Sequence, residues 1–149
     1  MYRISNEIIN ICDSKIELKE LDLETSENIK LLIYKNYLDK NRKGNWMWEK
    51  LKVYESLRDS NGWKYIKEFI SNNSCIIFFN QDEDKKMFRI ENGADLYYIL
   101  SETSGFEFYI TDLECTYLIC FNHHDILFGC KKAWTWLNMK RKKRALMES

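Results

Sequence analysis

The stretch Cys75-Ile76-Ile77-Phe78-Phe79 decides the fold class of this chain. Five consecutive apolar residues have the length of a strand, and because successive side chains point to opposite faces, both faces of this strand must be covered. A polar tip at 81–85 separates it from Met87-Phe88-Arg89-Ile90, which alternates and predicts the second strand of a hairpin. A second continuous run, Tyr117-Leu118-Ile119-Cys120-Phe121, predicts a central strand, and Ile126-Leu127-Phe128 predicts a strand that pairs back on it.

The rest of the second half adds one strand and two helices. Residues 106–111 alternate between apolar and polar side chains, which predicts a strand with one face in water. Residues 95–100 predict a short helix between strands. A last helix contains Ala133, Trp134 and Leu137 and runs into the basic run 140–144.

The first 70 residues predict helices. A helix is expected to begin near Ser26, a good N-cap residue with Glu27 in the first turn, and apolar residues follow at helical spacing. The apolar residues of 46–57 also fit helical spacing. After the Asn61-Gly62 turn signal, residues 63–70 predict a short helix.

Helices followed by strands that cluster in the chain predict an α+β fold. We expect a helical N-terminal half packed on an antiparallel sheet of about five strands, with one inserted and one C-terminal helix. The 149 residues are the size of one domain, and no linker or internal repeat divides them. The single domain 1–149 comprises a helical part (1–70), a sheet part (71–137) and a basic tail (138–149).

Several features predict a cytoplasmic protein. No apolar run approaches the ~20 residues that cross a bilayer. The N-terminal residues lack a basic segment followed by an apolar one, so no signal peptide is expected. The five cysteines have no framework spacing and are expected to be reduced, small apolar side chains.

The charges are segregated although the chain as a whole has a net charge of zero. Residues 71–130 contain three basic and ten acidic side chains, whereas residues 131–149 contain seven basic and one acidic. An acidic sheet surface would repel nucleic acid and attract a basic protein. The expected contact residues are six carboxylates and one tryptophan: Asp82, Glu83, Asp84, Glu107, Asp112, Glu114 and Trp136.

Two alternatives compete with this interpretation of the charge. The acidic residues can simply be solvated, with the C-terminal tail folding back over them and cancelling part of their charge. The basic run 140–144 could bind phosphates, but it contains no aromatic side chain and is typical of a helix end, where cations complement the helix dipole. Nucleic-acid binding is therefore not expected.

The tetrad Asn122-His123-His124-Asp125 contains both histidines of the chain. One hypothesis makes a histidine the general base, oriented by Asp125, with Cys120 or Cys130 as nucleophile. A metal hypothesis adds Cys115 and Cys120 as ligands. A third interpretation is a tight strand connection, because Asn and Asp bond their own backbone in turns. The chain has no other catalytic signature and no glycine-rich phosphate loop, so we expect no enzyme, cofactor or metal.

The segment from Trp63 to Leu137 resembles a family of small bacterial proteins. The resemblance lies in five pieces of this sequence: Gly62-Trp63, Cys75–Phe79, Phe106-Glu107-Phe108-Tyr109, Tyr117–Asp125 and Trp136-Leu137. Its members resemble immunity proteins encoded beside secreted polymorphic toxins of the LXG or contact-dependent type. The chain differs from the SUKH immunity proteins, whose motif contains a proline that this sequence lacks.

The resemblance implies an antitoxin that neutralises a cognate toxin, in many cases a basic nuclease, by direct stoichiometric binding. The expected partner is the C-terminal toxin domain of a secreted toxin, and no turnover is required. The alternative function is a small hydrolase or nuclease that uses His123, His124 and Asp125, with or without a metal.

Overall fold

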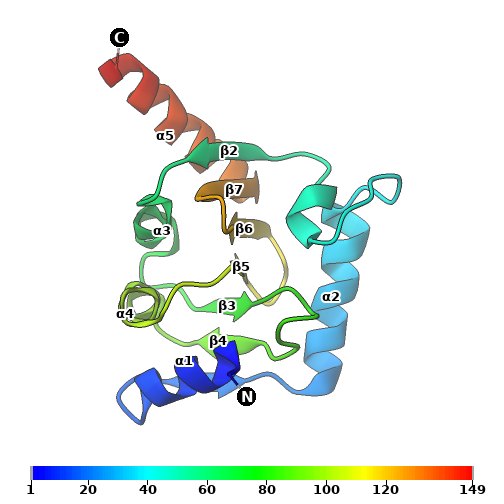
Figure 1. Ribbon diagram of the computed structural model, residues 1–149, viewed down its shortest axis with the longest axis vertical. Coiled ribbons are helices and arrows are strands. Elements are labelled where there is room, and N and C mark those ends of the chain that lie inside the picture. The colour runs from blue at the N-terminus through cyan, green and yellow to red at the C-terminus, as the bar shows by residue number, and fades with distance from the viewer. Residues whose placement is uncertain (1, 149) are drawn as a thin grey trace.

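A computed structural model describes residues 2–148 as a seven-stranded antiparallel sheet covered by helices on both faces (Figure 1). In chain order its elements are α1 (Ile4–Cys12), β1 (Leu18–Glu20), α2 (Leu23–Tyr37), the 3-10 helix η1 (Met47–Lys50), β2 (Glu55–Arg58), α3 (Gly62–Ile70), β3 (Cys75–Phe78), β4 (Phe88–Ile90), α4 (Ala94–Glu102), β5 (Phe108–Thr111), β6 (Tyr117–Phe121), β7 (Ile126–Lys131) and α5 (Lys132–Glu148). The α+β class is confirmed.

The strand order is β1-β4-β3-β5-β6-β7-β2, and every neighbouring pair is antiparallel. The expected count of about five strands is wrong because the first 70 residues supply both edge strands. β1 has three residues, too few for a visible alternation. β2 overlaps the end of the segment 46–57 that we expected to be helical, and it pairs with β7.

Two apolar cores lie on opposite faces of the sheet. On β3, Cys75 and Ile77 belong to the core beneath α1, α3, α4 and α5, whereas Ile76 and Phe78 belong to the core beneath α2 and η1. Figure 1 shows α1, α3 and α4 on one side of the strands and α2 with η1 on the other. The prediction that the continuous apolar strands are covered on both faces is confirmed.

The predicted wet face of β5 is wrong. Tyr109 and Thr111 are fully buried, because α2 and η1 cover the face that the alternating pattern assigned to water. The predicted start of α2 at Ser26 is also wrong. The helix begins at Leu23, and the side chain of Asp22 caps it by accepting a hydrogen bond from the N–H of Thr25 at 2.8 Å.

The basic run at 140–144 continues α5 and pairs with the first half of the chain. Arg141 Nε lies 2.8 Å from Glu55 Oε1, Arg144 Nη1 lies 2.8 Å from Asp59 Oδ2, and Lys140 Nζ lies 3.0 Å from Glu68 Oε2. Since all three carboxylates precede residue 71, these ion pairs do not cancel the charge of the acidic segment 71–130.

These contacts predict an acid-sensitive link between α5 and the β2–α3 loop. Burial acts to raise the pKa of Asp59, but hydrogen bonds from Tyr65 and from the N–H of Asn61, together with the charge of Arg144, hold it below its usual value. A carboxyl with a lowered folded-state pKa stabilises the fold above its unfolded-state pKa of about 3.9 and loses that contribution as pH falls through the folded-state value.

We therefore expect Asp59→Asn to be destabilised at pH 7 relative to wild type, and the difference in unfolding free energy to shrink below about pH 4. Urea unfolding at several pH values measures it. Lys143→Gln changes an exposed charge on the same helix and should leave the pH profile unchanged. A difference between Asp59→Asn and wild type that is constant down to about pH 2 would contradict the role of Asp59.

Candidate functional site

The tetrad and the buried carboxylate Glu107 lie at one end of the sheet. Because β3, β5, β6 and β7 alternate in direction, the end of β3, the start of β5 and the turn between β6 and β7 meet there. We call this region the histidine end of the sheet; it consists of Trp46, Trp48, Asn80, Asp82, Glu83, Glu107, His123, His124 and Asp125.

Glu107 is the centre of a buried hydrogen-bond network. Its side chain is only 4% exposed. It accepts hydrogen bonds from Asn80 Nδ2 at 2.7 Å, from Trp48 Nε1 at 3.2 Å and from the N–H of His123 at 2.9 Å, and it also contacts His123 Nδ1. The expectation that Glu107 is an exposed contact residue is therefore wrong: its carboxylate holds three segments of the chain together.

Tyr109 extends the network below Glu107. Its hydroxyl donates to Asn80 Oδ1 at 2.8 Å and accepts from the N–H of Trp48 at 3.3 Å. Burial raises the pKa of Tyr109 well above its usual value, so the hydroxyl stays protonated and can donate. The network thus fixes η1 against β3 and β5.

Four aromatic rings gather beside the carboxylate. The Trp46 and Trp48 rings stack with centroids 5.8 Å apart, and the Trp46 ring lies 5.0 Å from the His123 ring. The rings of His123 and His124 are 4.0 Å apart, and His124 meets the edge of Trp48 at 6.0 Å. Both tryptophans are half-buried: Trp46 directly precedes η1 and Trp48 lies in it, where we expected an α-helix.

The turn between β6 and β7 is built on Asn122. Its side-chain Oδ1 accepts hydrogen bonds from the N–H groups of His124 and Ile126, each at 3.0 Å. Asp125 has a φ of 60°, a left-handed conformation that Asp tolerates. The interpretation of the tetrad as a tight strand connection is confirmed.

The structure does not support the proposed cysteine nucleophiles. Cys120 and Cys130 are buried in the sheet core, where burial raises the pKa of the Cys120 thiol well above its usual value and that of Cys130 to about 12. A protonated, buried thiol is inert. The carboxylate that contacts His123 is that of Glu107, whereas Asp125 makes no such contact within residues 2–148.

The proposed metal ligands are also not brought together by the fold. Cys115 lies between β5 and β6, at the opposite end of β6 from the tetrad, so the strand separates it from the histidines. Within residues 2–148 no group of three or more His, Cys, Asp or Glu side chains is placed to hold a metal ion.

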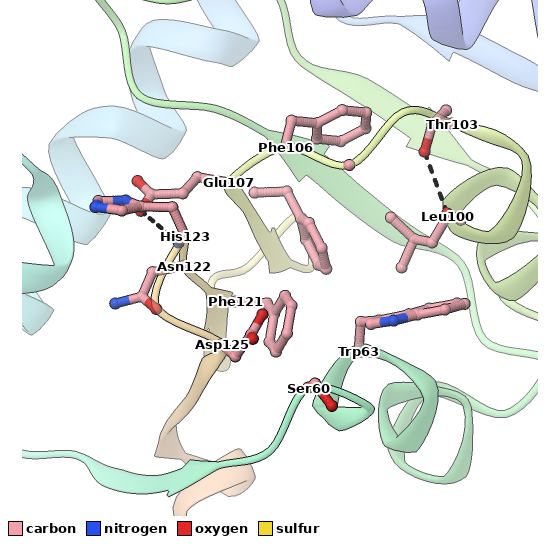
Figure 2. A pocket seen from close by; sticks show the side chains of 12 residues that line it. Ser60, Trp63, Leu100, Thr103, Phe106, Glu107, Phe121, Asn122, His123 and Asp125 are labelled. Carbon is pink, nitrogen blue, oxygen red and sulfur yellow. Dashed lines mark hydrogen bonds and ion pairs between the residues drawn. The ribbon is translucent and has the colours of Figure 1, made fainter.

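A pocket of about 350 Å³ adjoins the tetrad. Its lining combines apolar side chains from α3, α4, β5 and β6 with polar groups from the neighbouring loops. The full lining consists of Ser60, Trp63, Leu100, Thr103, Gly105, Phe106, Glu107, Phe108, Phe121, Asn122, His123 and Asp125. Figure 2 shows the His123 imidazole and the Asn122 amide directed away from the apolar walls formed by Leu100 and Trp63.

The remaining predicted contact residues do not form one surface. Asp82 and Glu83 are exposed at the histidine end. Asp84 is buried, and its carboxylate accepts from the N–H of Ser5 at 2.9 Å, so its expected exposure is wrong. Burial acts to raise the pKa of Asp84, but this hydrogen bond and others lower it on balance.

Asp112, Glu114 and Trp136 lie away from the histidine end. Asp112 and Glu114 are in the β5–β6 turn at the opposite end of the sheet, where Asp112 accepts from the N–H of Thr116 at 2.8 Å. Trp136 is half-buried on α5, with its ring 5.4 Å from that of Phe69. We predicted one contact surface from the charge and type of these residues, but the fold places Asp112, Glu114 and Trp136 apart from Asp82 and Glu83.

The fold and site define an α+β protein whose loops at one sheet end present aromatic, histidine and acidic side chains. Residues 2–143 match the model of a family of unknown function, DUF6756, and the chain belongs to this family. Neither the curated proteins nor the solved structures compared with the chain gave a match. Within residues 2–148, no helix has the length and apolar character needed to span a membrane.

Proposed function

We propose that this protein is a cytoplasmic immunity protein that binds a basic bacterial toxin domain stoichiometrically and thereby neutralises it. The observation on which the proposal depends is the histidine end of the sheet, where the exposed carboxylates Asp82 and Glu83 accompany the half-buried Trp46 and Trp48. Tryptophans within a polar rim are typical of the residues that contribute most to protein binding. The resemblance to immunity proteins supports the same class.

The buried network favours a binding surface that is already ordered before the partner arrives. Asn80 Nδ2 donates to Glu107 at 2.7 Å and to the exposed Glu83 at 3.0 Å, so the rim carboxylate is tied to the core. Trp48 and His123 are held by the same Glu107. A surface with fixed side chains loses less conformational entropy on binding.

The charge distribution supports a basic partner. Lys140, Arg141 and Arg144 of α5 pair with Glu68, Glu55 and Asp59, and not with Asp82 or Glu83. Exposed carboxylates at the rim of an interface speed the encounter with a positively charged protein. Asp84 and Glu107 are buried, and Asp112 and Glu114 lie at the opposite end of the sheet, so Asp82 and Glu83 are the proposed acidic contacts that remain at the histidine end.

A double charge reversal tests the proposal. Asp82→Lys/Glu83→Lys is expected to weaken binding of the toxin domain encoded beside this protein by about 10- to 100-fold, mainly through slower association, and to reduce the salt dependence of binding. Surface plasmon resonance at two salt concentrations measures both rates. Asp112→Lys/Glu114→Lys makes the same charge change at the opposite end and should bind like wild type.

Two results would count against the proposal, each in a different way. Equal affinity of the wild type and both double variants would refute docking through the histidine end while leaving immunity intact. A neighbouring toxin domain that neither binds the wild-type protein nor loses its toxicity on co-expression would refute the immunity function.

A His-based hydrolase is the second candidate. The contact of His123 Nδ1 with the buried Glu107 carboxylate favours it, because a carboxylate orients the imidazole in many general bases. The direction of the imidazole, away from the apolar walls of the pocket, argues against a substrate bound there (Figure 2). Ester or phosphodiester hydrolysis by the wild type that is lost in His123→Ala would establish this candidate.

A further inference from the structure

The pocket at the histidine end has aromatic walls. The rings of Phe106 and Phe108 meet edge to face with centroids 6.3 Å apart, and that of Phe121 lies 6.1 Å from Phe108. Trp63 forms the wall on the side of α3, and its stacking on Tyr97, with centroids 5.5 Å apart, fixes its orientation. Figure 2 shows Trp63, Leu100, Phe106 and Phe121 around the same space.

The lining of the pocket includes an unpaired negative charge. Asp125 is exposed, and within residues 2–148 its carboxylate has no hydrogen-bond or ion-pair partner. The side chain of Asn122 fixes the turn on which Asp125 stands. The residues lining the pocket include no lysine or arginine. Because it combines an anionic group with aromatic faces, this pocket favours binding of a cation.

We propose that this pocket receives an arginine side chain of the partner protein. The guanidinium would stack on the aromatic walls and pair with Asp125, while the aliphatic stem would pack on Leu100 and Phe106. The proposal rests on the proposed function, because the arginine would belong to the basic toxin domain.

Arginine fits this pocket better than lysine for two physical reasons. Its guanidinium is planar and can lie against an aromatic ring, and it is more weakly hydrated than an ammonium group, so less is lost when it enters an apolar space. A pocket of about 350 Å³ is large enough to hold such a side chain. The other carboxylate in the lining, that of Glu107, is already engaged with Trp48, Asn80 and His123.

A peptide titration tests the pocket without the toxin. The tripeptide acetyl-Gly-Arg-Gly-amide is added to the full-length protein, and NMR follows the indole N–H signal of Trp63, assigned with Trp63→Phe. We expect saturable binding with a Kd of about 1–10 mM. The same peptide with neutral citrulline in place of arginine should bind about tenfold more weakly.

Two matched variants locate the binding. Asp125→Asn should weaken the arginine peptide about tenfold and leave the fold intact, since Asn also tolerates the left-handed turn conformation. Asp82→Asn removes a carboxylate at the same sheet end but outside the pocket lining, and should bind the peptide like wild type. Equal binding of the citrulline peptide, equal losses in both variants, or no saturation up to ~50 mM would each overturn the proposal.

The outcomes separate the pocket from the immunity function. If the peptide does not bind but Asp82→Lys/Glu83→Lys weakens toxin binding, the arginine pocket is wrong and the immunity proposal stands. If the peptide binds at Asp125 but no neighbouring toxin does, the pocket chemistry stands and the proposed partner is wrong.

Discussion

Replacing Glu107 by alanine is expected to lower the free energy of unfolding by about 3–5 kcal/mol. The side chain is 4% exposed and accepts hydrogen bonds from Trp48, Asn80 and His123. Alanine would remove the acceptor that these three groups share, would leave Asn80 Nδ2 only its bond to the exposed Glu83, and would open a cavity between η1 and the sheet. The loss is large because Asn80 is buried and Trp48 is half-buried, so water replaces their hydrogen bonds to Glu107 only in part.

Urea unfolding followed by tryptophan fluorescence measures this loss. Glu107→Gln keeps the volume but points amide hydrogens at groups that are themselves donors, so we expect an intermediate loss of about 1–3 kcal/mol. Glu114→Ala removes an exposed carboxylate at the opposite sheet end and should stay within about 0.5 kcal/mol of wild type. A loss below about 1 kcal/mol in Glu107→Ala would show that the network does not hold this end of the sheet together.

Replacing Gly93 by alanine is expected to cost about 3 kcal/mol or more. Gly93 directly precedes α4 and lies against the loop that follows α3. A Cβ added at Gly93 would lie 2.2 Å from the carbonyl oxygen of Asn73 and 2.9 Å from that of Ser71. Both neighbours are backbone atoms, so α3 and α4 must move apart to make room. The methyl group would also come within 2.3 Å of Ile70 Cγ2.

Gly105→Ala is the matched control, because it isolates backbone strain from crowding. Gly105 has a φ of +90°, and an added Cβ would meet nothing within 4 Å. Its expected cost is about 1 kcal/mol, from the left-handed backbone alone. Thermal or urea unfolding compares the two variants, and a Gly93→Ala protein as stable as Gly105→Ala would contradict the close approach of the two helices.

Apolar continuity made the central strands predictable. The runs at 75–79 and 117–121 can be buried on both sides only within a covered sheet, and the structure places them at β3 and β6. The β6–β7 turn was equally predictable from the sequence, because the side chain of Asn122 bonds to residues only two and four positions away. Local chemistry of this kind is fully contained in a short stretch of sequence.

Glu107 shows where prediction from local sequence failed. It stands in an alternating segment next to apolar residues, a pattern that assigned it to the solvent face. Its acceptor role depends on Trp48, Asn80 and His123, which lie 59, 27 and 16 positions away. β2 was missed for the same kind of reason, because its strand conformation depends on its pairing with β7, which is also distant in sequence.

The sequence by itself determined the α+β class, the central strands, the turn at the tetrad and the position of most helices, because hydrophobic period and turn chemistry act between near neighbours. Only the tertiary structure decided which carboxylates are exposed, which of them contacts His123, and that Asp82 and Asp112 lie at opposite ends of the sheet. Burial and pairing of a charge depend on segments brought together from distant parts of the chain, and a linear pattern does not record that juxtaposition.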